Sequence, residues 1–163
     1  MELPKEVTGI LTEEEFKKQL PPLERILKGP VAFTECIQEI PCNPCVDACR
    51  FDAIKMENIS KPPQVDFDKC TGCTLCVSRC PGLAFFMIDG SRSDTHWRIT
   101  IPYEFLPMPK IGDVVEVIDR KGEVRGKGKV VRAIKLKDAT GVVTLEVPKE
   151  YAVEIRHFRR IEE

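Results

Sequence analysis

The sequence predicts an α+β protein built from unlike parts, and three observations lead to this fold class. All eight cysteines lie between residues 36 and 80, within which one cysteine pattern occurs twice. Residues 96–163 contain no cysteine, and several of their segments are typical of short strands. The chain, at 163 residues, is long for one small domain and short for two ordinary ones. We expect an N-terminal helical arm (1–30), a cysteine domain (31–90) and a small β-rich domain (91–163).

The arm carries a clear helix-start signal. Thr12 followed by Glu15 is a capping box, which predicts a helix that continues to about Leu20 and ends at the two prolines 21–22. The apolar residues at 23, 26 and 27 predict a further helical turn before Gly29. We interpret the arm as a structural lead-in that covers part of the core.

The C-terminal part predicts an antiparallel β-barrel or sandwich. In its third expected strand, Val143, Leu145 and Val147 share one face, whereas Thr144 and Glu146 share the other. We expect strands at 114–118, 128–136 and 142–147, a turn at 121–122, a short helix over 148–155 that begins at Pro148, and a linker at 90–95.

The cysteine segment contains an internal repeat. Residues 70–81 read CTGCTLCVSRCP, which is C-x2-C-x2-C-x3-C-P. An offset of 31 residues aligns three cysteines and one alanine of the first half with their counterparts in the second half. The remaining cysteines, Cys36 and Cys70, each end a V-x-F-x-x-C pattern. The first site is therefore lengthened by three residues rather than broken. The aligned pairs are Cys42 and Cys73, Cys45 and Cys76, Cys49 and Cys80, and Ala53 and Ala84.

Each half is expected to form a strand, a ligand loop, a short helix and a return strand, the last at 53–56 and 84–88. Neither half could bury a core alone, so we expect the two to pack face to face around a metal cofactor.

Several kinds of cysteine site are compatible with this spacing. A structural zinc ion needs four ligands, which leaves the other cysteines and Pro81 unexplained. Disulfides do not suit the reducing compartment that we expect for this chain. The spacing Cys36-x5-Cys42-x2-Cys45 also occurs among [2Fe–2S] proteins, and a three-iron site without Cys36 is a further alternative. The repeat favours two [4Fe–4S] clusters.

Residues 31–90 resemble a bacterial-type two-cluster ferredoxin, on the strength of CTGCTLCVSRCP and the partnered CNPCVDAC. The resemblance implies a pseudo-two-fold domain and crossed ligation, in which the fourth cysteine of each half binds the other half's cluster. Arg50 departs from the pattern, because such ferredoxins commonly carry proline there. The implied ligands are Cys36, Cys42, Cys45 and Cys80 for cluster one, and Cys70, Cys73, Cys76 and Cys49 for cluster two.

The wider phrase GPVAFTECIQEIPCNPC is similar to iron–sulfur subunits of flavin-dependent amino-acid or amine dehydrogenases of the multi-subunit proline dehydrogenase type. This resemblance implies a place in a complex with flavin-containing dehydrogenase subunits, and with a soluble electron acceptor as a further partner.

A cluster held by four thiolates transfers single electrons, so we expect an electron-transfer subunit with no catalytic residues of its own. No phosphate-binding or dinucleotide glycine pattern occurs, which assigns any flavin to another chain. The alternatives are a free-standing ferredoxin, which would not need the arm or the β domain, and a nucleic-acid-binding module that uses the basic run at 120–137. We interpret that run as a solvated face or a docking surface for an acidic subunit, and His96 and His157 as structural. Shielding of the clusters and core packing explain five phenylalanines equally well: Phe33, Phe51, Phe67, Phe85 and Phe86.

Bulk composition supports the same class of protein. There is no signal-like apolar run and no segment that could span a membrane, so we expect a cytoplasmic protein. The formal charge of −1 gives no reason to expect nucleic acid or another polyanion as a partner. A charged fraction of 31% with few amides is typical of proteins from thermophiles.

Overall fold

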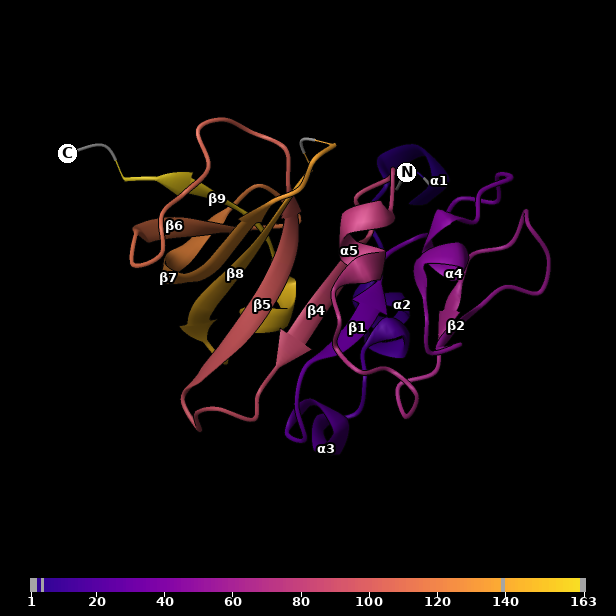
Figure 1. Ribbon diagram of the computed structural model, residues 1–163, viewed down its shortest axis with the longest axis horizontal. Coiled ribbons are helices and arrows are strands. Elements are labelled where there is room, and N and C mark those ends of the chain that lie inside the picture. Colours follow the sequence, from indigo (N-terminus) through magenta and orange to yellow (C-terminus); the bar gives the residue numbers. More distant parts are fainter. Residues whose placement is uncertain (1–2, 4, 139, 162–163) are drawn as a thin grey trace.

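A seven-stranded antiparallel sheet connects the cysteine segment with the C-terminal strands (Figure 1). The computed structural model describes residues 3, 5–138 and 140–161. The strand order is β1-β4-β5-β8-β7-β6-β9, and a separate two-stranded sheet pairs β2 with β3. The strands are β1 (Val31–Thr34), β2 (Ile54–Lys55), β3 (Gln64–Val65), β4 (Phe85–Asp89), β5 (His96–Tyr103), β6 (Val114–Asp119), β7 (Val124–Lys135), β8 (Gly141–Pro148) and β9 (Ile155–Arg160).

The helices are few and short, which makes this a mixed fold dominated by the sheet. In Figure 1, strands β5–β9 lie together on one side, α4 and β2 lie on the opposite side, and β1, β4 and α5 lie between them. The helices are α1 (Lys5–Thr8), α2 (Glu13–Gln19), α3 (Leu23–Ile26), α4 (Pro44–Ala48), α5 (Leu75–Arg79) and the 3-10 helix η1 (Ala152–Glu154).

The arm confirms the capping-box prediction. The Glu15 backbone N–H donates to Thr12 Oγ1 at 3.3 Å, and the Thr12 N–H donates to Glu15 Oε2 at 3.1 Å. These two bonds satisfy amide groups that the first turn of α2 would otherwise leave unpaired. Phe16 on this helix is buried and meets Phe33 of β1 edge to face, with ring centroids 6.4 Å apart. The predicted second turn is α3.

The cysteine segment has the elements expected of its repeat. Helices α4 and α5 begin at Pro44 and Leu75, whose numbers differ by 31, the offset that aligns the cysteines. The return strands are β2 and β4. Strand pairing joins the two halves, because β1 pairs with β4 and β2 pairs with β3, both antiparallel. Neither half therefore forms its sheets alone.

The C-terminal strands agree with the prediction in part. β6 and β8 lie where they were expected, β7 begins four residues early, and Gly122 forms the turn with a φ of +84°. The predicted helix over 148–155 is wrong. Pro148 ends β8 opposite His96, and only the single turn of η1 is helical before β9 begins. Proline is tolerated at such a strand end because it removes no interior ladder hydrogen bond.

The two faces of β8 are less different than the alternation predicted. Val143, Leu145 and Val147 are fully buried, as expected. Thr144 is also buried, and its hydroxyl oxygen lies 2.8 Å from that of Thr100 on β5. A threonine can be buried at low cost when its hydroxyl has a partner, and cross-strand Thr–Thr pairs supply one.

The loop at 90–95, predicted as a linker, connects two strands of one sheet. β4 pairs with β5 on the two sides of this loop, with Ile88 opposite Ile99. Both residues belong to one apolar core that includes Phe33 and Phe86 from the cysteine segment and Ile101 from β5. A continuous core and a continuous sheet extend across residue 91. The division of the chain into domains at this residue stays a prediction.

The helices among residues 3, 5–138 and 140–161 are all short. None of them has both the length and the apolar character needed to cross a bilayer.

Candidate metal-cluster sites

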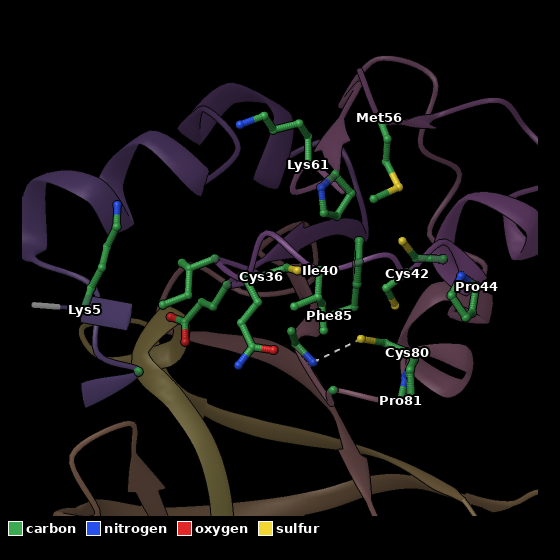
Figure 2. Close-up of a pocket in the computed structure, with 18 residues that line it drawn as sticks. Lys5, Cys36, Ile40, Cys42, Pro44, Met56, Lys61, Cys80, Pro81 and Phe85 are labelled. Atoms are coloured by element: carbon green, nitrogen blue, oxygen red, sulfur yellow. Dashed lines mark hydrogen bonds between the residues drawn. The ribbon is translucent and has the colours of Figure 1, made fainter. Parts of the chain in front are cut away.

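The first cysteine cavity opens beside the lengthened loop and has a volume of about 510 Å³. Its lining includes Cys36, Cys42 and Cys45 from the first half of the repeat, and Cys80 from the second half. Figure 2 shows the labelled Cys36, Cys42 and Cys80 gathered around this space, with Phe85 and Ile40 beside them. The residue at the end of α5 thus reaches the loop that precedes α4.

The second cavity has the complementary set of cysteines. Cys70, Cys73 and Cys76 line it from the second half, and Cys49 reaches it from the end of α4. It is much smaller, at about 20 Å³, and its other lining residues are almost all apolar. The structure therefore brings all eight sequence-predicted cysteines into two groups of four, each with three members from one half and one from the other.

Backbone N–H groups donate to sulfur in the same way in both halves. The N–H of Ala53 lies 3.4 Å from Cys49 Sγ, and the N–H of Ala84 lies 3.4 Å from Cys80 Sγ, which Figure 2 marks with a dashed line. These two alanines are related by the 31-residue offset. The N–H of Ala32 in β1 donates to Cys70 Sγ at 3.3 Å. Such bonds favour the thiolate form of a cysteine and tune a metal site that it holds.

Burial opposes ionisation of these thiols. Burial and the neighbouring Cys80 thiol raise the pKa of Cys45 to about 11, and burial also raises the pKa of Cys36. In the second group, burial followed by the Cys70 and Cys73 thiols raises the pKa of Cys76. The raised pKa values keep Cys36, Cys45 and Cys76 protonated unless a cation compensates their charge, so the donor sets fit a cationic metal cofactor.

The loop of the second half winds tightly because two of its residues adopt left-handed backbone conformations. Gly72 has a φ of +74° and Thr74, which precedes α5, has a φ of +69°. A Cβ atom on Gly72 would lie 2.5 Å from the Pro30 ring, so glycine is required both by conformation and by space. The end of the arm is therefore in close contact with this cysteine loop.

The lengthened loop of the first half is held by contacts outside itself. The Cys36 N–H donates to Thr34 Oγ1 at 3.0 Å, and the Cys42 N–H donates to the Ile59 carbonyl oxygen at 3.0 Å. Glu39, inside the loop, pairs with Lys61 at 2.7 Å. These contacts attach both ends and the middle of the inserted segment to the rest of the fold.

Each of the two donor sets consists of four cysteine sulfurs that line one cavity. Among the described residues, no group of three or more His, Cys, Asp or Glu is placed to hold one metal ion. Four thiols that line one cavity match an inorganic core bound through cysteine sulfur. The four-sulfur donor sets therefore fit iron–sulfur clusters.

The other residues singled out in the sequence divide into core and surface. Phe33, Phe85 and Phe86 are buried, and Phe85 also lines the first cavity, whereas Phe51 lines the second cavity and is largely exposed. His157 stacks on Tyr103 with ring centroids 5.9 Å apart and takes part in neither cavity. The His96 ring bonds to its neighbour in sequence, Thr95.

Sequence reasoning missed three charged residues close to the sites: Arg25, Glu35 and Arg156. Arg25 lies in the arm, Glu35 directly precedes Cys36, and Arg156 lies in β9. No local pattern marks them, because their partners are distant in sequence. A weak signal was available only for Glu35, a charged residue that directly follows three apolar residues and a threonine.

Comparison with known protein families gives one result that bears on the site. Residues 35–84 match the family of 4Fe-4S dicluster domains. The match covers all eight cysteines and leaves out the arm and strands β5–β9. No solved structure matches the chain. The match supports a ferredoxin-like domain that binds 4Fe-4S clusters and serves in electron transfer.

Proposed function

We propose that this chain, with its ferredoxin-like domain, holds two [4Fe–4S] clusters and relays electrons within a flavin-dependent dehydrogenase complex. The observation that supports it most directly is the division of the cysteines between two cavities. Each cavity takes three sulfurs from one half and the fourth from the other half, which is the crossed ligation of two-cluster ferredoxins. On this proposal Cys36, Cys42, Cys45 and Cys80 bind cluster one, and Cys70, Cys73, Cys76 and Cys49 bind cluster two.

The chemistry of such sites is limited to electron transfer. A cluster bound by four thiolates supplies a one-electron redox couple and has no open position for a substrate. The residues of this chain fix the sulfur atoms, donate N–H groups to Cys49, Cys70 and Cys80, and line the second cavity almost entirely with apolar side chains. Two such sites in a domain of about 60 residues would form a short relay with two ends.

Two features support a place in a complex. The lengthened loop puts Ile40, which is 53% exposed, at the edge of the first cavity. A partner subunit docked there would cover both Ile40 and the cavity opening. The arm and the five C-terminal strands add structure that electron transfer through the clusters does not need, and both pack onto the cysteine segment. We assign the flavin to a partner subunit and place a soluble acceptor at the other end of the relay.

A free-standing carrier is the second candidate, and gel filtration of the native protein from its own cells separates the two. Elution together with larger flavin-containing subunits supports the complex, and elution alone at the monomer size supports the free carrier.

Nucleic-acid binding has less support, because the basic run is partly neutralised within the protein. Arg125 pairs with Glu154 at 2.8 Å and with Asp119 at 3.3 Å. Arg120 lies over the Phe16 ring, 3.6 Å from its centroid, instead of reaching into solvent. We therefore propose no nucleic-acid partner.

Iron and acid-labile sulfide analysis on anaerobically purified protein tests the proposal. Two cubane clusters require about eight iron and eight sulfide atoms per chain. Spin-resonance spectra of the reduced protein should show two interacting centres. Zinc, or a single two-iron centre, would refute the proposal.

A further inference from the structure

Arg25, at the end of the arm, connects the arm to the backbone around Cys70. Its Nε–H donates to the Phe67 carbonyl oxygen at 2.7 Å, and its Nη2 donates to that of Cys70 at 2.7 Å. The same guanidinium donates to the carbonyl oxygens of Gly29 at 3.0 Å and Pro30 at 3.3 Å. All four acceptors are neutral, so the positive charge of Arg25 is not cancelled by these partners. One planar group thus joins the chain before β1 to the segment that begins the second cysteine loop.

Arg156, in β9, makes the corresponding connection to the first cysteine loop. Its side chain is only 9% exposed, and its Nη2 donates to Glu35 Oε1 at 2.5 Å. Its Nη1 donates to the Val153 and Ile155 carbonyl oxygens, both at 2.7 Å. Glu35 is the residue directly before Cys36. Glu35 Oε1 also pairs with Arg120 at 3.5 Å, and the Arg156 contact is the shorter and more buried of the two. Breaking a buried ion pair is costly, so the Arg156 contact constrains the Glu35 position.

Aromatic rings surround the Arg156 guanidinium and fix its plane. Its central carbon lies 4.4 Å from the Phe86 ring centroid, 5.3 Å from that of Phe33 and 5.4 Å from that of Phe16. Cation–π contacts of this kind are favourable, particularly where water is excluded. The contacts join the arm, β1, β4 and β9 at one point, immediately beside the start of the lengthened loop.

Cys36 and Cys70 occupy the same place in the repeat, since each ends a V-x-F-x-x-C pattern. They are the leading cysteines of the two halves, and neither is part of a short helix, unlike Cys45 and Cys76. Their positions therefore depend on what holds the backbone just before them. In both cases an arginine from outside the cysteine segment adds a side-chain contact to the backbone hydrogen bonds found there.

We propose that Arg25 and Arg156 are positioning residues for the two cluster sites, and that each holds the leading cysteine of one half from outside the cysteine segment. Arg25 acts on Cys70 through its carbonyl oxygen, and Arg156 acts on Cys36 through Glu35. The inference rests on the proposed function, because it assigns these cysteines to clusters. It also gives the arm and β9 a role at the sites.

The proposal makes a site-selective electrostatic prediction. A positive charge near a cluster favours the reduced, more negative state. Arg25→Gln removes such a charge beside Cys70, so at a fixed ambient potential the reduced-to-oxidised ratio of cluster two should fall on the order of tenfold. Glu35→Gln removes a negative charge beside Cys36 and should shift cluster one in the opposite direction. Each variant should leave the other cluster unchanged.

Protein-film voltammetry on the full chain tests this, with Cys36→Ser and Cys73→Ser used to assign the signal of each cluster. The conservative variants Arg25→Lys and Arg156→Lys keep the charge but lose most of the planar contacts. They should leave the potentials nearly unchanged and speed iron loss to a chelator at one cluster only, by about 10-fold. Arg98→Lys is the matched control, since Arg98 is a partly exposed arginine that pairs with Glu146 on β8.

The outcomes separate this inference from the proposed function. Protein that contains both clusters, with waves that the Arg25 and Glu35 variants do not move or move together, overturns the inference alone. Protein without iron–sulfur clusters overturns both. Circular dichroism shows whether Arg25→Gln folds. If it does not fold, the two lysine variants and Glu35→Gln, which retain a charge or a hydrogen-bonding group, test the inference by whether each affects one cluster only.

Discussion

Replacing Gly72 with alanine tests the packing of the arm against the second cysteine loop. Gly72 has a φ of +74°, and an added Cβ would lie 2.5 Å from Pro30 Cγ and 2.8 Å from the Pro30 carbonyl oxygen. The proline ring and its backbone cannot rotate away as a flexible side chain would. Gly72→Ala therefore adds two costs, one for the backbone conformation and one for the steric overlap.

The two costs can be separated with a second glycine. A left-handed conformation costs a non-glycine residue about 1–2 kcal/mol. Overpacking adds about 1–3 kcal/mol. Gly122, in the turn between β6 and β7, has a φ of +84°, and an added Cβ would meet nothing within 4 Å. Gly122→Ala therefore includes the first cost without the second.

Thermal unfolding of the two variants, followed by circular dichroism under anaerobic conditions at one scan rate, measures the difference. For a protein of this size each 1 kcal/mol lowers the Tm by about 2–4 °C, so Gly72→Ala should melt about 2–12 °C below Gly122→Ala. It should also lose absorbance from cluster two first. Equal melting temperatures would show that the arm is not packed against this loop, and would refute the reasoning.

Three further predictions concern the ligands, the titration of His157 and the basic run. Cys36→Ser should damage one cluster and spare the other, as judged by iron content and spin resonance; two unchanged centres would show that Cys36 is not a ligand. Burial lowers the pKa of His157 below its ordinary value of 6.5, so the unfolded chain binds the proton more readily and stability should fall as the pH decreases below about 6.5. His157→Gln should reduce this dependence in melts at pH 7.5 and 5.5, and an identical pH dependence in the variant would assign the effect to other groups. Filter binding at low and moderate salt should detect no salt-sensitive association with nucleic acid, because Arg120 and Arg125 are engaged within the protein; retention that fell with salt would reopen the nucleic-acid alternative.

The features that depend on local spacing could be predicted from the sequence. The capping box of Thr12 and Glu15 and the helices at α4 and α5 follow from intervals of three residues or from the offset of 31. Such intervals determine which side chains share a face or a loop, so they carry structural information without knowledge of the tertiary fold. The grouping of the cysteines was implied by the resemblance to two-cluster ferredoxins.

The features that depend on distant partners could not be predicted. β5 and β9 have mixed polar and apolar residues, and their pairing with β8 and β6 becomes evident only in the assembled sheet. Thr144 looked like a surface residue because its partner, Thr100, is 44 positions away. The Arg156 contact with Glu35 spans 121 positions, and its buried guanidinium is part of a strand that reads as exposed and basic.

The exchange of the fourth cysteine between the halves affects how this protein can be made and altered. A ribosome that has released only the first half has delivered three of the four thiols around the large cavity, and the missing one follows 31 residues after Cys49. On the proposed ligation, the first cluster cannot be completed until the second half has been translated. Loss of either repeat by gene deletion would leave two incomplete sets, so the duplication is difficult to reverse in evolution.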